Sequence, residues 1–486
     1  MIKLNRPDLF SELALVGGEW RPAASGRTVD VDNPATGERI GSVPDCGAED
    51  ARAAIDAAAA AFPAWRARTA GDRAQILERW HALVLENVAD LARIMTAEQG
   101  KPLAEAEGEI RYAATFIKWF AEEGRRVGGY TVPAPETSRR ILVMKEPIGV
   151  SAAITPWNFP AAMITRKCAP ALAVGCPVVV KPSELTPFTA LALVKLAVEA
   201  GVPAGVINIV TGLPTAIGAE LTANPTVRKL SFTGSTRVGA LLMRQSADTI
   251  KRLSLELGGN APLIVFDDAD LDLAVESAMA SKFRNAGQTC VCANRILVQD
   301  GVHDEFAARL AKAVVALKVG PGDAPGVTSG PLINAAAVEK VRAHVDDALR
   351  HGAKVLATAD CPSSSSRFVA PVVLTGANSS MRLASEETFG PVAPLFRFRE
   401  EAEAIELAND TPFGLASYFY TQDLHRAFRV AERLEAGMVA LNTGSIAMEM
   451  APFGGVKQSG LGREAGREGL EEYLETKAFH IAGLKL

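Results

Sequence analysis

The chain has 486 residues, of which 48% are apolar and 22% are charged. This is the composition of a globular protein, and the length is sufficient for two or three packed units. Lysine and arginine total 51 and aspartate and glutamate total 56, for a formal net charge of −5; with no basic block to neutralise phosphates, a nucleic-acid-binding protein is disfavoured.

The N-terminal segment is interrupted by charges and lacks the apolar core and cleavage site of a secretory signal peptide. The longest apolar stretch near the middle of the chain, residues 173–180, contains Pro177 and is too short to cross a bilayer. We therefore expect a cytoplasmic protein with no membrane partner. A mitochondrial protein already trimmed of its transit peptide would have the same sequence features.

Cysteine and histidine usage limits the other classes of protein. The cysteines are few for this length and only one pair is close in the sequence, so a secreted disulfide scaffold is excluded. They are Cys46, Cys168, Cys176, Cys290, Cys292 and Cys361. The six histidines are scattered, and neither HExxH nor CxxC occurs. The sequence therefore predicts no metal site.

Apolar runs alternate with helical patterns through most of the chain, which is typical of an α/β fold with parallel sheets. The first predicted elements are helices at 50–62 and 73–95, favoured by alanine content and by apolar positions with a period of 3.6 residues. From residue 150 onward the predicted strands are 178–181, 206–210, 230–232, 262–266, 295–298, 392–398, 416–421 and 438–441. The predicted helices between them are 189–200, 271–285, 400–408 and 423–434.

Two segments lie outside this alternation. Residues 125–144 form a Gly- and Pro-containing extended ribbon, and residues 473–486 are expected to form a last strand. Unpaired strand edges of this kind favour pairing between subunits, so we expect a homo-oligomer, either a dimer or a tetramer. The serine run 363–366 is expected to be a surface loop.

The densest chemical signal is the segment Phe283 to Cys290, FRNAGQTC. A helix is expected to end there, a glycine turns the chain, and Cys290 is left on a loop, where it can act as a nucleophile if its proton is withdrawn. A cysteine is otherwise often a small buried apolar residue, so the context has to decide between the two.

Two further motifs supply that context. Glu256 ends a predicted strand and is followed by two glycines, which is where open α/β sheets bind ligands, so it can serve as a general base. Asn158 lies between aromatic residues and prolines in PWNFP, and its amide can donate to a developing oxyanion. Taken alone, a Glu before a Gly pair is more often a solvated turn residue, and Trp157 and Phe159 are more often core residues.

A third group of motifs suggests a nucleotide. Lys181 and Glu184 follow a predicted buried strand, and a carboxylate there can bind ribose hydroxyls. The turn FTGSTRVG at residues 232–239 can place a pyrophosphate at a helix N-terminus, although it matches neither a P-loop nor GxGxxG. Glu387 and Phe389, in EETFGP, can hold a second ribose. Each of these motifs by itself is also compatible with an ordinary strand-to-helix turn.

Together the motifs resemble the aldehyde dehydrogenase superfamily. PWNFP, KPSE, FTGST, LELGG, GQTC, EETFGP and PFGGVKQSGLGRE occur in the order and at the spacings of that family. The resemblance runs from about residue 15 to the end of the chain. Within the superfamily the chain is most similar to the succinate-semialdehyde dehydrogenases, notably in NFPAAMITRK and SKFRNAGQTCVCANR.

The resemblance implies a reaction and a role for each catalytic residue. Cys290 attacks the aldehyde carbonyl, and the Asn158 amide and the Cys290 backbone N–H hold the oxyanion. Hydride passes to NAD(P), and Glu256 hydrolyses the resulting thioester through water. The same chemistry follows from the residues, because acyl formation and release require a nucleophile, an oxyanion donor and a base.

The resemblance also implies a binding set and a domain plan. The residues implied to bind the dinucleotide are Thr155, Pro156, Trp157, Lys181, Ser183, Glu184, Gly212, Phe232, Gly234, Ser235, Leu257, Glu387 and Phe389. The expected domains are a Rossmann-like dinucleotide-binding domain (1–125 and 146–257), a catalytic α/β domain (258–457) and a β oligomerisation arm (126–145 and 470–486).

The semialdehyde subgroup implies that arginines bind the far carboxylate of the substrate. Arg166 and Arg284 occupy the matching positions, with Phe159 and Phe453 beside the substrate, and guanidinium binds carboxylate in a bidentate fork. Arginines that only cap helices are the structural alternative. Ala447 stands where the subgroup usually has serine, which leaves succinate semialdehyde, glutarate semialdehyde or another carboxylated aldehyde as substrate.

Two residues lead to separate expectations. Glu184 stands where NADP-preferring relatives tend to have a small residue, and its charge repels a 2′-phosphate, so NAD is predicted to be preferred, with NADP still possible because of Lys181. Cys292 lies two residues beyond Cys290. If that segment is extended, both thiols point to the same side, and a strained disulfide between them is a hypothetical oxidative switch. The alternative is that Cys292 is only a small packing residue.

Two other functional classes compete with this interpretation. A cofactor-independent cysteine hydrolase would use Cys290 with no redox step, but it calls for a histidine near the cysteine and none lies within the motifs. A non-catalytic binding protein would be favoured by loss of Cys290 or Glu256, and both are present.

Overall fold

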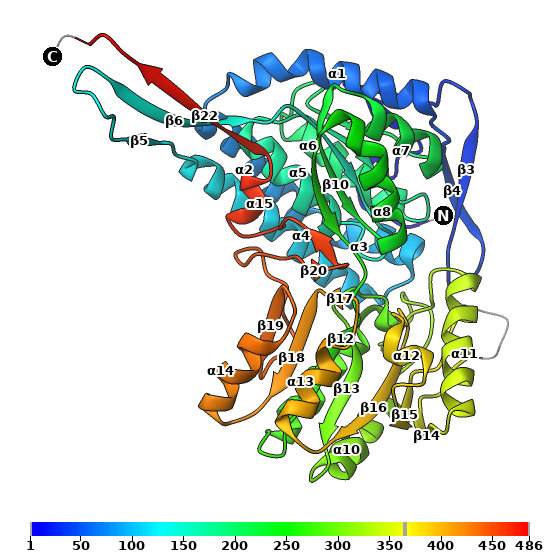
Figure 1. Ribbon diagram of the computed structural model, residues 1–486. Coiled ribbons are helices and arrows are strands. Elements are labelled where there is room, and N and C mark those ends of the chain that lie inside the picture. Colours follow the sequence, from blue (N-terminus) through cyan, green and yellow to red (C-terminus); the bar gives the residue numbers. More distant parts are fainter. Residues whose placement is uncertain (1, 363–366, 485–486) are drawn as a thin grey trace.

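The structure is a computed structural model that describes residues 2–362 and 367–484. It is a mixed α/β protein with two large, mainly parallel sheets and a projecting β arm (Figure 1), which confirms the predicted fold class. The serine run 363–366 lies outside the described residues. No helix of the described part is long and apolar enough to cross a bilayer.

The N-terminal region forms four helices of the described chain: α1 (Ala48–Arg66), α2 (Ala70–Glu86), α3 (Val88–Gln99) and α4 (Leu103–Glu123). The single helix predicted at 73–95 is therefore wrong, because the chain breaks at Asn87. Asn87 leaves helical geometry at φ −108° and ψ 19°, and its amide Nδ2 donates to the Leu83 carbonyl at 2.8 Å. An asparagine side chain that bonds a nearby backbone carbonyl competes with the hydrogen bonds that would continue the helix. The period of the apolar residues carries no information about this competition.

The first sheet has the strand order β2-β1-β9-β8-β7-β10-β11-β21 within the described residues. Its parallel centre runs from β9 to β11, and β1, β2 and β21 pair with it or with each other in antiparallel fashion. The strands are β1 (Ala14–Val16), β2 (Glu19–Arg21), β7 (Val150–Ile154), β8 (Val178–Lys181), β9 (Ile207–Ile209), β10 (Val227–Thr233), β11 (Arg252–Glu256) and β21 (Gly460–Leu461).

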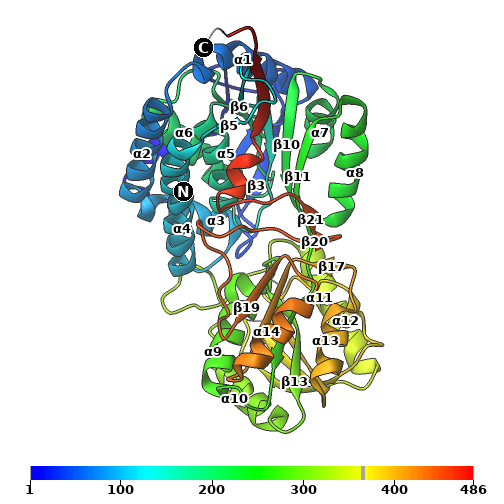
Figure 2. The same ribbon diagram turned by 60° about the vertical axis from the view of Figure 1, so that its left-hand side comes forward.

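Helices cover both faces of this sheet. The buried apolar residues of α1, α7 (Pro214–Ala223) and α8 (Thr236–Ser246) pack in one cluster with strand residues. Those of α2, α3, α4, α5 (Ala162–Val174) and α6 (Pro187–Glu199) pack in another. Figure 2 shows α7 and α8 on one side of β10 and α2, α4 and α6 on the other. A parallel sheet buried on both faces explains the continuous apolar strands such as VVVK in β8.

The second sheet has the order β14-β15-β16-β13-β12-β18-β19, in which β14 is the antiparallel edge. Its strands are β12 (Ala261–Val265), β13 (Ala293–Gln299), β14 (Lys354–Thr358), β15 (Val372–Ala377), β16 (Val392–Phe398), β18 (Ala416–Tyr420) and β19 (Met438–Leu441). Its helices are α9 (Leu271–Lys282), α10 (His303–Val315), α11 (Ala335–Arg350), α12 (Arg382–Ser385), α13 (Glu401–Asn409) and α14 (Leu424–Arg433). The helix predicted to reach residue 285 ends at Lys282, and the short segment η4 (Arg284–Gly287) follows.

The arm is a three-stranded antiparallel sheet in the described chain, ordered β22-β6-β5. It joins β5 (Tyr130–Val132) and β6 (Arg140–Pro147) to β22 (Leu474–Ile481), near the end of the chain. The arm projects from the body in Figure 1, and in Figure 2 it lies in front of the upper part of the molecule. One edge of β22 carries no neighbouring strand within this described chain.

Smaller elements connect these units. The described segments are η1 (Pro7–Leu9), the hairpin β3 (Thr28–Asp32) with β4 (Arg39–Pro44), η2 (Gly124–Arg126), η3 (Ala247–Thr249), the pair β17 (Phe413–Gly414) with β20 (Val456–Lys457), and α15 (Glu468–Glu471).

Candidate active site

The predicted chemistry gathers at the carboxyl edge of the first sheet, which faces the second sheet (Figure 2). Strand β11 ends at Glu256, β8 ends at Lys181, and the PWNFP motif follows β7 directly. Because parallel strands end at one edge, residues far apart in the sequence meet there. The chain crosses from Glu256 to β12 in five residues, so the second sheet begins at the same place.

Cys290 lies in a tight turn after three residues in the left-handed region. Asn285, Ala286 and Gly287 have φ angles of 52°, 53° and 75°. The Cys290 side chain is half-buried. Opposite it, a Cβ on Gly259 would lie 2.6 Å from the Cys290 carbonyl oxygen, so glycine is needed for the two backbones to approach. The structure thus places the predicted nucleophile on an ordered loop at the sheet edge.

Charged groups surround the Cys290 thiol. Burial raises its pKa to about 12, the carboxyls of Glu387 and Glu256 add to this rise, and the guanidinium groups of Arg166 and Arg284 oppose it. Both predicted arginines and the predicted base are therefore close enough to Cys290 to act on its charge. At neutral pH the thiol is protonated, so nucleophilic attack requires a base to remove that proton.

Glu256 is buried with neither carboxyl oxygen in a hydrogen bond to any described residue. Burial and the neighbouring Glu464 carboxyl raise the pKa of Glu256 well above its ordinary value. A Cβ on Gly454 would lie only 2.8 Å from Glu256 Oε1, so glycine leaves room for the carboxyl there. Buried acids without partners are rare in stable cores, and a raised carboxyl pKa suits a general base.

Arg166, Lys167 and Glu464 form a buried ion-pair cluster beside Glu256, and the sequence did not predict it. Lys167 Nζ donates to Glu464 Oε1 and, at 2.7 Å, to Thr233 Oγ1. Burial opposes ionisation of Glu464, but Lys167 and Arg166 lower its pKa, so it is negatively charged beside Glu256. Lys167 and Glu464 lie within the quoted motifs NFPAAMITRK and GLGRE. Only the fold shows that these two motifs touch.

Asn158 lies where it can stabilise an oxyanion. Its amide Nδ2 donates to the Gln288 carbonyl at 3.1 Å, which leaves the second N–H of that amide for another acceptor. Its own carbonyl accepts from Lys101 Nζ at 2.8 Å and from Asn285 Nδ2 at 3.0 Å. The side chain is buried and held against the loop that carries Cys290.

Arg166 lies deep in the site between aromatic rings. Its Cζ is 5.1 Å from the Phe116 ring centroid and 4.2 Å from the Phe453 centroid. Nη2 donates to Tyr112 Oη at 3.3 Å, and Nη1 is 3.5 Å from Glu464 Oε2. Its Nε and Nη1 make no hydrogen bond to the described residues.

Arg284, by contrast, is exposed and forms no ion pair within residues 2–362 and 367–484. Its guanidinium carbon is 5.2 Å from the centroid of Phe159. The structure therefore pairs each predicted arginine with a predicted aromatic residue, Arg166 with Phe453 and Arg284 with Phe159, and one arginine is buried while the other is exposed. A guanidinium over an aromatic face keeps its donors directed outward.

The adenosine end of the predicted nucleotide site lies along β8 and α8. Lys181 Nζ donates to Glu184 Oε2 at 2.9 Å, and Glu184 keeps 30% of its side chain exposed. At the start of α8, Ser235 Oγ accepts from the Val238 N–H, and Gly234 lies over the Phe232 ring, where a Cβ would be 2.4 Å away. The first-turn N–H groups of α8 suit a pyrophosphate.

The nicotinamide end lies beside Cys290. Glu387 Oε1 accepts from the Gly259 N–H at 3.1 Å, and burial raises the pKa of Glu387 to about 7. Phe389 has a φ of 56°, and its ring meets Trp157 edge to face with centroids 5.6 Å apart. The chemistry of this donor set fits a dinucleotide: a carboxylate at each end, a helix N-terminus between them and an aromatic pair.

The remaining predicted cofactor residues line the same edge. The Thr155 N–H donates to the Lys181 carbonyl, and Pro156 follows it. Ser183 Oγ accepts from the Leu185 N–H. A Cβ on Gly212, with φ 107°, would lie 2.7 Å from the Cys46 nitrogen, and one on Gly239 would lie 2.4 Å from Leu257.

The segment around Cys292 differs from the expectation. It is a turn, with the Cys292 N–H donating to the Thr289 carbonyl at 3.1 Å, so the extended geometry assumed for the disulfide hypothesis is wrong. The Cys292 thiol is buried and accepts from Lys282 Nζ at 3.4 Å. Both cysteines are free thiols, and the redox switch itself stays a prediction.

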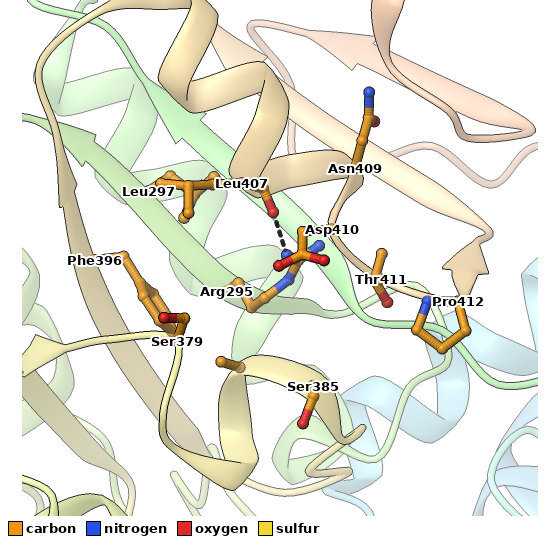
Figure 3. Close-up of a pocket in the computed structure, with 11 residues that line it drawn as sticks. Arg295, Leu297, Ser379, Ser385, Phe396, Leu407, Asn409, Asp410, Thr411 and Pro412 are labelled. Carbon is orange, nitrogen blue, oxygen red and sulfur yellow. Dashed lines mark hydrogen bonds between the residues drawn. The ribbon is translucent and has the colours of Figure 1, made fainter.

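A cavity of about 360 Å³ lies elsewhere in the second sheet region, between β13, β16 and the end of α13 (Figure 3). Its wall includes Arg295, which donates to the carbonyls of Leu407 at 2.6 Å and Ala408 at 2.7 Å. None of the predicted site residues lines it. Within residues 2–362 and 367–484, no cluster of three or more His, Cys, Asp or Glu side chains could hold a metal ion.

Comparison with known proteins identifies the family. The Aldehyde dehydrogenase family profile matches residues 20–479. The chain is 60% identical to an Escherichia coli succinate-semialdehyde dehydrogenase whose name specifies NADP(+), over 98% of this chain and 99% of that one. It is 59% identical to a glutarate-semialdehyde dehydrogenase of Pseudomonas putida, over 99% and 100% of the two chains. A crystal structure of succinate-semialdehyde dehydrogenase from Burkholderia pseudomallei superimposes with a TM-score of 0.98 at 60% identity, covering 99% of this chain and 100% of that one. The protein described here therefore belongs to the aldehyde dehydrogenase family.

Proposed function

We propose that the protein oxidises a small carboxylated aldehyde to its acid with NAD(P), and that succinate semialdehyde is the substrate. The observation that carries the substrate class is the pair Arg166 and Arg284, which flank Cys290 with unused donors. Arginine binds a carboxylate in a bidentate fork. A relative of nearly equal identity is named for glutarate semialdehyde. That aldehyde is therefore the alternative.

The first step is removal of the Cys290 proton. Because burial and nearby carboxyls hold the pKa of the thiol at about 12, the ionised form of Glu256 is the proton acceptor. The thiolate sulfur then forms a bond to the aldehyde carbon, and the carbonyl electron pair moves onto oxygen. The free N–H of the Asn158 amide and the Cys290 backbone N–H donate to that oxygen.

The cofactor, when bound, supplies the hydride acceptor for this adduct. Glu184 and Lys181 would hold its adenosine ribose, the α8 N-terminus its pyrophosphate, and Glu387 its nicotinamide ribose. Trp157 and Phe389 would limit water at this end of the site. Loss of hydride from the adduct leaves a thioester on Cys290.

The second step on the protein is thioester hydrolysis. Glu256 first releases to solvent the proton that it took from Cys290. Its carboxylate then takes a proton from water, the water oxygen bonds to the acyl carbon, and the Cys290 thiolate leaves. The carboxylic acid departs, and Glu256 passes the proton from water to the Cys290 thiolate, which returns both groups to their starting protonation states. A buried carboxyl with a raised pKa and no fixed partner suits this proton exchange.

Two finer assignments complete the proposal. The Glu184 carboxylate repels a 2′-phosphate, so NAD is proposed as the preferred cofactor even though relatives at 60% and 55% identity are named for NADP(+). Ala447 is half-buried and has no hydroxyl to donate to the substrate carboxylate. Loss of a hydrogen bond to a charged acceptor costs roughly 1.5–3 kcal/mol. A longer substrate whose carboxylate contacts only the arginines would lose less binding free energy from the absence of this hydroxyl.

The test is an aldehyde panel followed by absorbance of the reduced cofactor. Succinate semialdehyde, glutarate semialdehyde and butanal are each assayed with NAD and with NADP. The proposal expects kcat/KM to be highest for a carboxylated aldehyde, with succinate semialdehyde first. Equal kcat/KM for butanal would overturn the assignment of a carboxylated substrate. A protein that hydrolysed esters but did not oxidise any aldehyde with either cofactor would instead be a cysteine hydrolase.

The Arg284→Gln variant tests the anchor at the rim. KM for succinate semialdehyde should rise roughly 10- to 100-fold because one charge-assisted hydrogen bond is lost. KM for butanal should stay within about twofold, since butanal has no carboxylate. Arg350→Gln, an exposed arginine on α11, is the matched control. Equal losses on both aldehydes in Arg284→Gln would mean that this arginine is structural.

A further inference from the structure

Asn285 uses nearly all of its polar groups across the boundary between the two sheets. It is buried, with 1% of its surface exposed. Its N–H donates to Glu105 Oε2 at 2.8 Å, and its Oδ1 accepts from Gln99 Nε2 at 2.9 Å. Its Nδ2 donates to the carbonyls of Asn158 at 3.0 Å and Gln288 at 3.3 Å. The Asn285 side chain therefore ties α3 to both catalytic loops, and its backbone N–H adds a bond to α4.

These bonds close a triangle around the oxyanion donor. The Gln288 carbonyl that accepts from Asn285 also accepts from Asn158 Nδ2 at 3.1 Å. Asn158 belongs to the loop after β7, whereas Gln288 precedes Cys290 by two residues. Asn285 thus holds both the Asn158 peptide and the Gln288 carbonyl, and the Asn158 amide is oriented by its bond to that same Gln288 carbonyl. It touches neither the thiol nor the oxyanion position by any of these bonds.

The backbone at this position selects the residue type. Asn285 has φ 52° and ψ 36°, and Ala286 follows at φ 53° and ψ 33°. Asparagine tolerates the left-handed region better than most side chains, which are strained there. A glycine would fit the same backbone but has no amide. Asparagine alone combines this conformation with a neutral donor able to bridge two carbonyls.

We infer that Asn285 is a positioning residue that aligns the Asn158 oxyanion donor with the Cys290 loop. The inference rests on the proposed function. It predicts that Asn285 acts on the reaction through Asn158, and not through cofactor binding or overall stability.

A double-mutant cycle tests this dependence. The variants are Asn285→Gly, Asn158→Ala and the double variant, with Ala286→Gly as the control that also relaxes a left-handed residue. Removing an oxyanion donor costs roughly 10²- to 10³-fold in kcat. Asn285→Gly alone should lower kcat roughly 10- to 100-fold, with cofactor Kd within about twofold of wild type. Ala286→Gly should keep kcat within about threefold.

The decisive comparison is the Asn158→Ala background. There Asn285→Gly should lower kcat by less than about threefold, because the group it positions is gone. Independent, multiplicative losses would overturn the inference. Asn285→Asp, which keeps the backbone preference and the shape but directs a carboxylate at two carbonyls, should reproduce the loss if Asn285→Gly folds poorly.

Crystal structures of Asn285→Gly and Ala286→Gly separate this inference from the proposed function. If wild type oxidises no aldehyde, the proposed function fails, but the geometry is still measurable. The distance from Asn158 Nδ2 to the Gln288 carbonyl is expected to exceed hydrogen-bonding range in Asn285→Gly and to stay near 3.1 Å in the control. An unchanged distance in both variants would overturn the positioning role.

Discussion

At the scale of single residues, the surroundings of Cys290 and of Glu256 both disfavour the ionised form that each needs for catalysis. Burial raises the pKa of the thiol to about 12, and burial together with Glu464 raises the pKa of Glu256. A thiol that is a poor nucleophile at rest is protected from oxidation. The same environment makes proton transfer between the two groups the first requirement of the proposed reaction.

Replacement of the nucleophile is the most direct check. Cys290→Ala should lower aldehyde oxidation by roughly 10⁴-fold or more, because no covalent adduct can form, while cofactor binding measured by fluorescence titration stays unchanged. Cys292→Ala, which removes a buried thiol bonded to Lys282, is the matched control and should keep most of the activity. If Cys290→Ala kept a tenth of wild-type kcat, covalent catalysis would be excluded.

The role of Glu256 gives a pH dependence whose sign follows from its raised pKa. The base works only when ionised, so wild-type turnover should rise with pH above 4.5 and level off above the raised pKa of Glu256. Glu256→Gln should lose this limb, form up to one reduced cofactor per active site rapidly, and then turn over roughly 10²- to 10⁴-fold more slowly. Stopped-flow absorbance across pH measures both phases. A wild-type pH profile in the variant would rule out the base.

At the scale of elements, the loop between β8 and α6 carries the residue on which the proposed cofactor preference depends. Glu184 pairs with Lys181 at 2.9 Å and is partly exposed, so its carboxylate is accessible to a nucleotide bound as proposed beside β8. Removing the carboxylate leaves Lys181 free to attract a phosphate.

Glu184→Ser should therefore raise kcat/KM with NADP several-fold and lower it with NAD. Initial rates at saturating aldehyde with each cofactor measure the change. Glu199→Ser, at the exposed far end of α6, serves as the control. A wild-type enzyme that already works better with NADP would contradict the argument from Glu184.

The turn that carries Cys292 replaces the extended segment expected from the sequence. Alternation along a strand would place Cys290 and Cys292 on one side, but a hydrogen bond from Cys292 N–H to the Thr289 carbonyl closes a turn. Cys292 instead packs inward on Lys282. A disulfide between these thiols would require the turn to open first, so its formation depends on loop motion and not on strand geometry.

At the scale of the whole molecule, the arm extends away from the core that the two large sheets share. Tyr130 on β5 and Phe479 on β22 are 61% and 50% exposed. Large apolar side chains on a projecting sheet, next to an unpaired edge of β22, are typical of a surface that another subunit covers.

Charged residues on the arm should therefore weaken assembly. The double variant Tyr130→Lys with Phe479→Lys should have a lower mass than wild type by light scattering after size exclusion, with unchanged circular dichroism. Val315→Lys, at an exposed apolar position on α10, is the control and should keep the wild-type mass. An unchanged mass in the arm variant would show that the arm does not hold subunits together.

The sequence by itself determined the alternation of strands and helices, the strand ends that carry Glu256 and Lys181, and the turn that carries Cys290. These features are local. The period of the apolar residues, the positions of the glycines and the residue type at a strand end can be recognised in the sequence without knowledge of tertiary contacts. They were sufficient to predict the family, which the comparisons confirm, and to propose the residues that carry the chemistry.

Only the tertiary structure decided which distant segments complete the site. Lys167 meets Glu464 across 297 positions, and Gln99 reaches Asn285 across 186. The left-handed φ at Asn285 also goes with hydrogen bonds to particular remote partners. Sequence patterns report burial and local preference, whereas the partner of a buried polar group is set by how remote elements pack, because each such group must be satisfied wherever the fold places it.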